Sequence, residues 1–430
     1  MNYIRFILIL CANGVALYEA ILGLLQVFGL EVSRHTRFVI TGSFYNPGIY
    51  GGCIAMLLAV LASYVVQNRT VVLWQEKALW WLSCASCALC FIVLPASLSR
   101  AAWLGYGVAV LIFGFLECGL RQRIRTHRTI STILSTIAVL LLIGMFFLKK
   151  DSAIGRLHIW HMEIISIAAK PWKGYGKGRV LGVYGDTQAA YFAAEERSEN
   201  IVRVAGSPEF AFNEYLTVGV EYGVPAMVAM MVLVICLIAL LLRQRSPFGY
   251  GAVVLAVFAF FSYPFSSIKF SSEADRVWEA ANVYDSMDMH EEAIESYVLV
   301  YEELKGNYRF LYDYGYALHK IGRHEASNAI LAEGSRISSD PMFYNIMGKN
   351  FEAMGLPCKA EECYRHAHFM VPGRIYPLVL LEEMYIGLGM LDKAEETMTE
   401  INKIHINERN RNMQDLKRRA ERNLEKVIIQ

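Results

Sequence analysis

Two arginines occupy positions where a phosphate group could be bound. Arg100 opens an apolar run, and Arg156 precedes Trp160 by about one helical turn. A guanidinium at the edge of a bilayer is costly unless its side chain extends to the headgroups or binds an anion. Its planar N–H donors also match a phosphate in a two-point contact. Arg100 is therefore either an interfacial anchor or a phosphate clamp.

Further charged residues follow Arg156 along the chain. The glycine-rich segment from Pro171 to Arg179 adds Lys173 and Lys177, and two acidic residues, Glu209 and Glu214, come later. A carboxylate can in general take the proton of an attacking hydroxyl. The basic groups are secondary candidates for phosphate binding.

The sequence contains no catalytic motif of a soluble enzyme. It lacks a phosphate loop, a nucleophile elbow, an HExxH helix and a dinucleotide fingerprint. The spacing of Cys84, Cys87 and Cys90, without histidine or acidic neighbours, favours helix packing over a metal site. We therefore expect neither a metal nor a cofactor. The formal net charge of +1 also gives no reason to expect nucleic acid as a partner.

The composition is typical of a membrane protein, with 55% hydrophobic and only 19% charged residues. Nearly all long apolar runs precede Phe270. We predict a membrane domain at 1–270, with a polar loop at 149–222, and a soluble domain at 271–430. Windows of about 20 apolar residues predict about seven spans. They are Phe6–Phe28, Ile49–Val66, Ala78–Pro95, Ala101–Cys118, Thr129–Leu148, Gly223–Leu242 and Phe248–Ile268.

Basic residues in the short connections predict the orientation of these spans. Short loops rich in Lys and Arg face the cytoplasm. The loop after the fourth span has four arginines (Arg121, Arg123, Arg125 and Arg128), and the loops after the second and sixth spans are also basic. Arg34 and Arg37 weakly oppose this orientation. The polar loop and the soluble domain would then lie outside, which in a bacterium is the periplasm.

The segment 271–430 contains an internal repeat. A turn followed by a small residue recurs at Ala293, Ala326, Ala360 and Ala394, with spacings of 33, 34 and 34 residues. In period, turn and small residue it resembles the tetratricopeptide family. The expected fold is all-α: a polytopic transmembrane bundle followed by a tetratricopeptide α-solenoid. Such arrays present a concave surface to a protein partner, although they can also act only as a stiff support.

The membrane segment resembles the O-antigen ligase and polymerase superfamily. The likeness runs from Asn46 to Ser266 and follows five loose motifs in order. These are Phe44-Tyr45-Asn46-Pro47-Gly48, Arg100-x3-Leu104, Arg156-x3-Trp160, Pro171-x2-Gly174-x-Gly176, and Asn213-x-Tyr215-Leu216 continuing to Glu221-x-Gly223.

This resemblance implies transfer or polymerisation of a glycan from undecaprenyl diphosphate, in lipopolysaccharide or other polysaccharide biosynthesis, at the periplasmic face of the bacterial inner membrane. The acceptor would be lipid A core or another glycan. Arg100 and Arg156 would neutralise the leaving diphosphate, which needs no nucleotide sugar or metal. The matching positions Asn46, Trp160, Asn213 and Tyr215 would bind substrate, together with Lys173, Lys177 and Arg179.

The sequence departs from that family in two respects. The ligases have a histidine directly before the Asn of the Asn-x-Tyr-Leu motif, where this chain has Phe212. Three explanations follow: Glu209 or Glu214 replaces it as the base, His158 or His161 does, or ligation is lost. The membrane domain is also shorter than the dozen or so spans of the family, which is consistent with a fragment, a truncated gene product or a reduced variant.

Two other functions are consistent with the sequence. The protein could be a non-catalytic envelope scaffold that recruits partners through its repeats, which the lost histidine supports. It could also be a transporter, because a bicarbonate transporter-like branch resembles the same superfamily. A transporter needs ionisable groups near the middle of a span, whereas Glu19 and Glu117 lie nearer the helix ends.

Overall fold

The computed structural model describes residues 3–35, 38–127, 129, 132–133, 136, 150–195, 197–262, 272–406 and 410–428. The described secondary structure is entirely helical, as expected from the sequence. Contacts divide the chain into two compact units. The membrane unit consists of Met1–Leu148, Phe212–Tyr215 and Ala226–Ile268. The loop–repeat unit consists of Lys149–Ala211, Leu216–Pro225 and Lys269–Gln430.

Five described helices are long and apolar enough to cross a membrane. They are α1 (Tyr3–Val27), α2 (Pro47–Gln67), α3 (Trp74–Ala96), α4 (Arg100–Glu117) and α11 (Val224–Arg243), with the shorter apolar helix α12 at Pro247–Phe261. They correspond to six of the predicted spans. Most of the predicted span Thr129–Leu148 and the last residues of Phe248–Ile268 lie outside the described residues. A short helix, α5 (Leu120–Thr126), follows α4.

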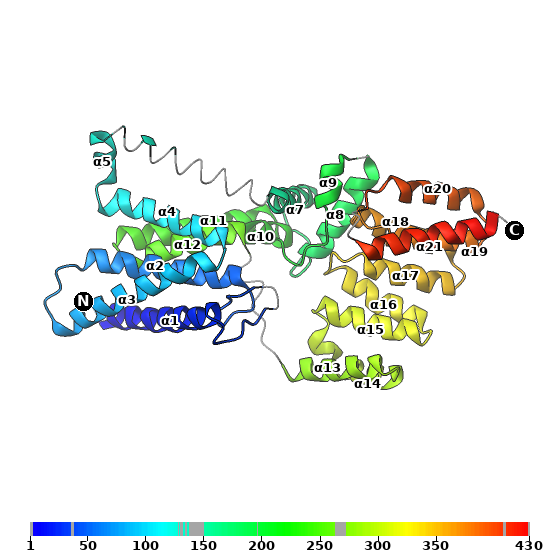
Figure 1. The fold of residues 1–430 in the computed structure, drawn as a ribbon, viewed down its shortest axis with the longest axis horizontal. Coiled ribbons are helices and arrows are strands. Elements are labelled where there is room, and N and C mark those ends of the chain that lie inside the picture. The colour runs from blue at the N-terminus through cyan, green and yellow to red at the C-terminus, as the bar shows by residue number, and fades with distance from the viewer. Residues whose placement is uncertain are drawn as a thin grey trace. The chain divides into compact units, whose positions relative to one another are not determined.

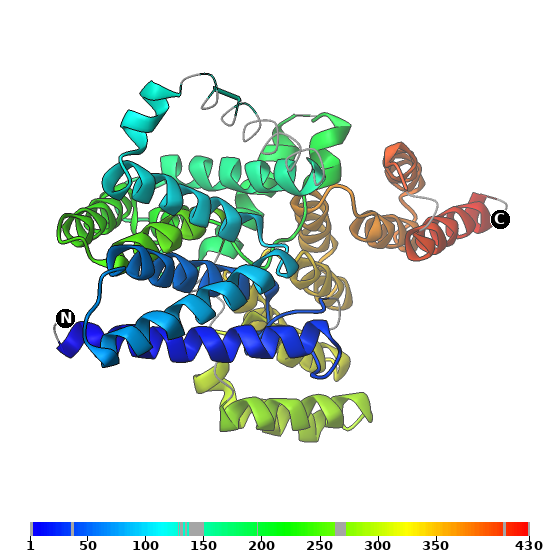
Figure 2. The same cartoon turned by 60° about the vertical axis from the view of Figure 1, so that its left-hand side comes forward.

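Small residues allow the helices of the membrane unit to approach closely. Figure 2 shows α1, α2 and α3 side by side, and α12 packs on both α2 and α4. A Cβ on Gly52 would lie 2.8 Å from the ring of Phe258, and one on Gly105 would lie 2.9 Å from the Val254 carbonyl oxygen. Close backbone approach at small residues is the usual basis of helix association in a bilayer. These glycines therefore fix α12 against its two neighbours.

Hydrogen bonds identify which helix termini share each end of the bundle. At one end, Arg5 donates to Gln67 (3.3 Å), and Gln67 donates to Glu117 (3.5 Å). This end therefore joins the start of α1 to the ends of α2 and α4, and we call it the basic end. At the opposite end, the Ser99 hydroxyl lies 3.4 Å from the Gly48 carbonyl oxygen, so α2 and α4 both begin there.

The loop–repeat unit begins with the helices of the predicted polar loop. These are α7 (Lys150–Ala169), α8 (Val180–Ala194), α9 (Glu199–Val204) and α10 (Glu214–Tyr222), of which α10 starts in the membrane unit. Helix α7 packs on α8 and α9. The loop is therefore a folded helical element.

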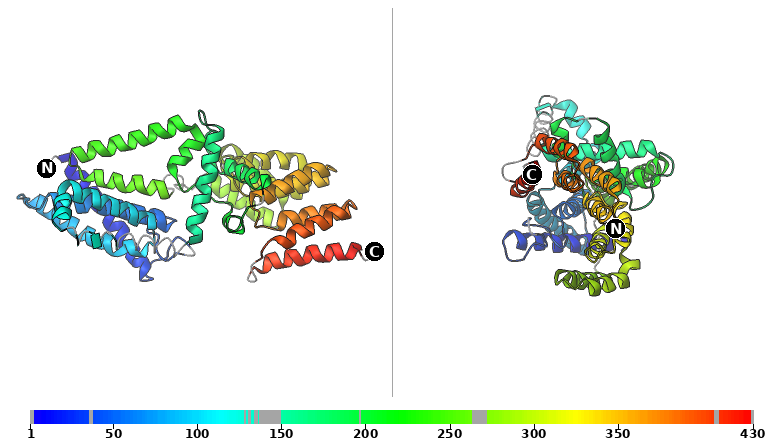
Figure 3. Two further views of the ribbon diagram at one scale, coloured as in Figure 1. Left: turned by 90° about the horizontal axis from the view of Figure 1, so that it is seen from above. Right: turned by 90° about the vertical axis from the view of Figure 1, so that its right-hand side faces the viewer.

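The repeats form four antiparallel helix pairs and a final helix (Figure 1). The pairs are α13 (Glu273–Ser286) with α14 (His290–Leu304), α15 (Tyr308–Lys320) with α16 (His324–Ser335), α17 (Met342–Ala353) with α18 (Pro357–Met370), and α19 (Tyr376–Gly387) with α20 (Leu391–Lys403). Helix α21 (Arg411–Ile428) packs on α19 and α20, as the left panel of Figure 3 shows. This arrangement confirms the helical repeat architecture.

The register expected for the second repeat is wrong by one residue. Ala293, Ala360 and Ala394 are fully buried, as expected for the small position, but Ala326 is exposed. Ser327 takes its place, because its hydroxyl donates to the Gly315 carbonyl oxygen (2.7 Å) inside the helix pair. Ala326 and Ser327 are adjacent and both small, and the serine fills the buried position.

The loop helices pack against the repeats. A Cβ on Gly182 would lie 2.1 Å from the Arg336 carbonyl oxygen, and one on Gly185 would lie 2.6 Å from the Met370 side chain. Asp186 also accepts from Tyr344 (3.2 Å) and is paired with His366 (3.1 Å). The compact units therefore divide the chain differently from the sequence domains 1–270 and 271–430, which stay a prediction.

Candidate functional site

The first part of the candidate site is the end of the membrane unit where α2 and α4 begin. The Asn46 side chain accepts from the Gly48 N–H (2.7 Å) and caps α2, while Ser99 caps α4 by accepting from Ala102. Arg100 is the first residue of α4 and is half-buried. Helix N-termini carry unpaired N–H groups and a partial positive charge, which favour anions. Two N-termini and a guanidinium thus gather positive charge at one end of the bundle.

Asn213, Glu214 and Tyr215 belong to the same unit and are all buried. Asn213 accepts from the Tyr215 N–H (3.0 Å) and so begins α10 with a side-chain cap. The Tyr215 hydroxyl donates to the Ala256 carbonyl oxygen on α12 (3.1 Å). Ala256 lies close in sequence to Phe258, which packs on Gly52 near the start of α2. Tyr215 is therefore held at the same end of the bundle as Asn46 and Arg100.

Phe212 precedes this segment with an unusual backbone conformation. Its φ is 58°, in the left-handed region that non-glycine residues rarely adopt and in which histidine is several-fold enriched. The backbone here thus suits the histidine of the ligase motif better than the phenylalanine that is present.

An apolar cavity of about 260 Å³ lies beside Tyr215. It is bounded by α11 and α12, and the rings of Tyr215 and Phe260 are 6.1 Å apart at its wall. No charged residue lines it. A cavity of this kind suits a hydrocarbon chain.

Helix α7 supplies the second set of candidates. Arg156 and Trp160 are half-buried, and Glu163 continues the same helical face about one turn later. Glu163 is 1% exposed, and neither carboxylate oxygen has a hydrogen-bond partner among the described residues. Burial raises the pKa of Glu163 well above its ordinary value, which favours the protonated form of this side chain. Its spacing from Arg156 was visible in the sequence, but its burial was not.

His158 is buried and held by Gln188. Its Nε2 lies 2.8 Å from the Gln188 Oε1, so Nε2 carries the proton. Burial lowers the pKa of His158, which favours the neutral imidazole. His161 is exposed and packs edge-on against Tyr191, with ring centroids 5.7 Å apart. These contacts give His158 a structural role and leave His161 at the surface.

The glycine-rich turn with Lys173 and Lys177 is paired with the end of α10. Tyr175 N–H donates to Val220 O, and Gly176 N–H donates to Glu221 O, both at 2.9 Å. The Glu221 carboxylate accepts from the Gly178 N–H (2.6 Å). A Cβ on Gly174 would lie 2.5 Å from Glu221. The two motifs therefore form one structural element.

The basic residues of this turn differ in exposure. Lys173 and Lys177 are exposed, and Arg179 is half-buried at the start of α8. Their φ-positive neighbours Gly174 and Gly176 keep the turn tight. A charged ligand can thus reach both lysines.

Glu209 forms an ion pair with Arg309 of the repeats, at 2.7 Å. Both side chains are more than half exposed, so the pair contributes little to stability. The pairing occupies the carboxylate that was a candidate base. Glu214 is buried beside Asn213 in the membrane unit.

The two arginine candidates belong to different compact units, Arg100 to the membrane unit and Arg156 to the loop–repeat unit. Their convergence on one diphosphate stays a prediction. The membrane unit alone brings together Asn46, Arg100 and Tyr215. The loop–repeat unit alone brings together the lysine turn, Arg179 and α7.

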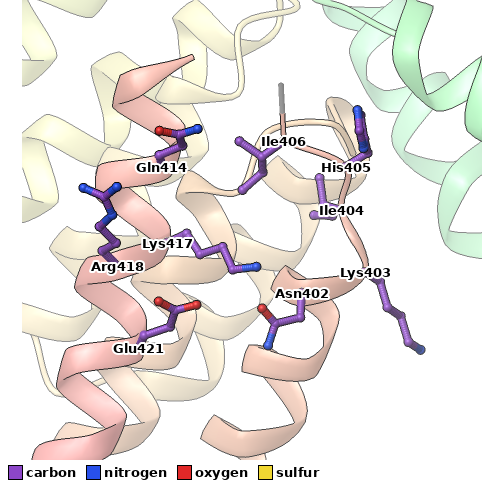
Figure 4. Close-up of a pocket in the computed structure, with 9 residues that line it drawn as sticks. All are labelled: Asn402, Lys403, Ile404, His405, Ile406, Gln414, Lys417, Arg418 and Glu421. Atoms are coloured by element: carbon purple, nitrogen blue, oxygen red, sulfur yellow. The ribbon is translucent and has the colours of Figure 1, made fainter. Parts of the chain in front are cut away.

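A cavity of about 510 Å³ opens beside the connection from α20 to α21. No motif of the sequence indicates it. In Figure 4, Lys417 extends from α21 towards Asn402 of α20, and Glu421 lies one turn further along α21. We assign this cavity no ligand.

The described fold is thus that of a multi-pass helical membrane protein with C-terminal helical repeats. Residues 85–231 match the family model described as O-antigen ligase, and residues 276–334 match that described as YpiA-like, C-terminal tetratricopeptide repeats. The chain therefore carries an O-antigen ligase region followed by tetratricopeptide repeats, which confirms both resemblances. The ligase match contains Arg100, Arg156, Glu209 and Glu214.

Other comparisons add little. No curated protein matches the chain. Among solved structures, the crystal structure of MamA is similar at 21% identity, covering 30% of this chain and 75% of that chain, with a TM-score of 0.29. A similarity of this size carries no argument about fold or function here.

Proposed function

We propose that the protein transfers or polymerises a glycan from undecaprenyl diphosphate at the periplasmic face of the bacterial inner membrane. The observation that carries this proposal is the pair of helix N-termini at one end of the membrane unit, together with Arg100, which lies inside the O-antigen ligase match. A diphosphate leaving group needs such preorganised positive charge. The apolar cavity beside Tyr215 would take part of the prenyl chain.

The reaction is a displacement at the anomeric carbon. An acceptor hydroxyl forms the new C–O bond while the bond from the sugar to the diphosphate breaks, and undecaprenyl diphosphate leaves with the electron pair. Arg100 and Arg156 would stabilise the charge that develops on the diphosphate. Glu214 would take the hydroxyl proton, because Glu209 is already paired with Arg309.

A non-catalytic envelope scaffold is the alternative, and Phe212 favours it. A phenyl ring cannot accept a proton at the position where the ligase motif has histidine. In this alternative the repeats would recruit a protein partner and the arginines would only anchor the helices. The two functions make different predictions for single substitutions, because only the glycosyltransferase requires Arg100 and Arg156.

The test is deletion of the gene in its bacterial host, followed by electrophoresis of lipopolysaccharide and capsule. Long chains should be lost and lipid-linked glycan should accumulate if the protein is a ligase, whereas single-repeat products indicate a polymerase. Complementation with Arg100→Ala or Arg156→Ala should lower chain transfer at least 100-fold. The matched control Arg69→Ala, at the basic end, should restore wild-type chains.

The variant Phe212→His adds a test in the opposite direction. Histidine tolerates the φ of Phe212 and restores a proton acceptor at that position. Transfer should rise several-fold, with a new pH dependence near the pKa of an imidazole. An unchanged envelope after deletion, or full complementation by Arg100→Ala, would support the scaffold.

A further inference from the structure

The loop–repeat unit contains a cavity of about 1070 Å³ that belongs to no motif. Its wall combines residues around α8 and α9 with residues of α18, α20 and the start of α21, and α8 packs directly on α18 (Figure 1). The volume is at the upper end of the range of about 300–1,000 Å³ for small-molecule sites. An occupant larger than a monosaccharide therefore fits.

The charges of the cavity wall are balanced. Five Lys or Arg residues line it beside four Glu residues. Two ion pairs stand in the wall, Arg197 with Glu195 at 2.9 Å and Arg365 with Glu400 at 2.6 Å. A wall in which guanidinium and carboxylate groups already pair does not select a polyanion. It presents fixed donors and acceptors to a neutral, hydroxyl-rich ligand.

Two side chains of the wall have a buried polar atom without a partner among the described residues. They are the Nε of Arg197 and the Nδ1 of His368. Such an atom costs about 1–3 kcal/mol when it stays unpaired. Because each atom is buried, a hydroxyl of an occupant would satisfy it only after the side chain rotates towards the cavity.

Apolar groups complete the wall. Phe192, Phe369 and Val371 line the cavity between the charged residues. A pyranose ring has an apolar face of C–H groups and a rim of hydroxyls, so it matches aromatic rings interleaved with guanidinium and carboxylate groups. An extended peptide would need a row of amide-binding groups, whereas guanidinium and carboxylate groups predominate among the polar side chains of this wall.

We propose that this cavity binds an oligosaccharide, as a second glycan site that holds the polysaccharide while the membrane unit performs the transfer. The proposal rests on the proposed function for the identity of its ligand. Because loop residues and repeat residues form the wall together, the repeats would have a direct part in substrate recognition.

The test is titration calorimetry on the full-length protein in detergent, with two probes: the O-chain repeat oligosaccharide and the core oligosaccharide released from the host lipopolysaccharide. Binding of the first indicates the donor glycan, and binding of the second indicates the acceptor. Arg197→Gln should weaken binding at least ten-fold. Thr399→Trp, which fills the cavity without removing a charge, should do the same.

The matched control is Arg309→Gln, which removes an ion pair between loop and repeats away from the cavity. It should bind like wild type, as should Arg100→Ala. Loss of transfer with retained binding in Arg100→Ala separates this cavity from the transfer site. The proposal would be overturned if neither sugar binds, or if folded Thr399→Trp binds sugar as tightly as the wild type does. It would also be overturned if a peptide, and no other sugar, displaces the bound sugar.

Discussion

Glu382 occupies a position at which the other repeats have a small residue. It lies seven residues before the φ-positive turn residue Gly389, as Gly348 does before Gly355 and Gly315 before Gly322. Those glycines contact large side chains of the paired helix. Glu382 is fully buried, and neither carboxylate oxygen has a partner within the described residues.

Replacing Glu382 by alanine should stabilise the protein at high pH. Burial, and secondly Glu383, raise the pKa of Glu382 to about 7, so folding favours the protonated form. The stability that this proton provides is complete below the ordinary pKa and is lost as pH rises through about 7. At pH 8, Glu382→Ala should raise the free energy of unfolding by roughly 1–3 kcal/mol, with a smaller gain at pH 5.

The measurement is the thermal unfolding midpoint of the detergent-solubilised protein at both pH values. Glu395→Ala, at an exposed position of α20, serves as the control and should change neither midpoint. The unfolding midpoint of the wild type should be further below that of Glu382→Ala at pH 8 than at pH 5. The same difference at both pH values would show that burial does not favour the protonated carboxyl.

Helix α8 connects the loop to the repeats, and Gln188 is the centre of that connection. The side chain is fully buried. Its Nε2 donates to the carbonyl oxygens of Gly206 (3.1 Å) and Met370, and its Oε1 accepts from His158 and Tyr184. One amide thus links α7, α8, the segment after α9 and the end of α18.

Gln188→Leu should loosen α7 from the repeats. It leaves several buried groups without partners, each at a cost of about 1–3 kcal/mol. Limited proteolysis should cut the segment 195–207 at least ten times faster. Transfer should fall in parallel, because His158 lies two residues from Arg156 on α7.

The control for this experiment is Ala190→Leu, which adds the same side chain on the exposed face of α8. It should leave both the cleavage rate and transfer at wild-type values. Unchanged proteolysis in Gln188→Leu would mean that the glycine contacts of α8 alone hold the loop.

At the scale of the whole molecule, charge is distributed between the two ends of the membrane unit. The formal net charge is only +1, yet the start of α1 and the ends of α2 and α4 meet at the basic end, which continues into the arginines of α5. Arg100 and Asn46 lie at the opposite end. This arrangement follows the rule that basic connections stay in the cytoplasm.

The orientation can be measured with two native cysteines. Cys118, at the end of α4, and Cys358, in α18, are both exposed thiols. A membrane-impermeant maleimide should label Cys358 in cells whose outer membrane is permeabilised, and Cys118 only after the inner membrane is opened. Cys358→Ser and Cys118→Ser identify the two signals. Labelling of Cys118 before Cys358 would reverse the proposed topology.

The sequence by itself determined the features that depend on contiguous residues. Apolar length predicted the spans, and a period of 33 to 34 residues predicted the repeats, because each depends on side chains within one or two helices. The order of the motifs also predicted the O-antigen ligase region. In the second repeat this reasoning failed by one position, since Ser327 and Ala326 are both small and only packing distinguishes them.

Only the tertiary structure decided which distant residues meet. Gln188 and Met370 are 182 positions apart. The cavity wall joins Phe192 and Met413, which are still further apart along the chain. The burial of Glu163 and Glu382 likewise depends on neighbouring helices. Long-range contacts follow from how amphipathic surfaces pack together, and local composition does not encode that choice.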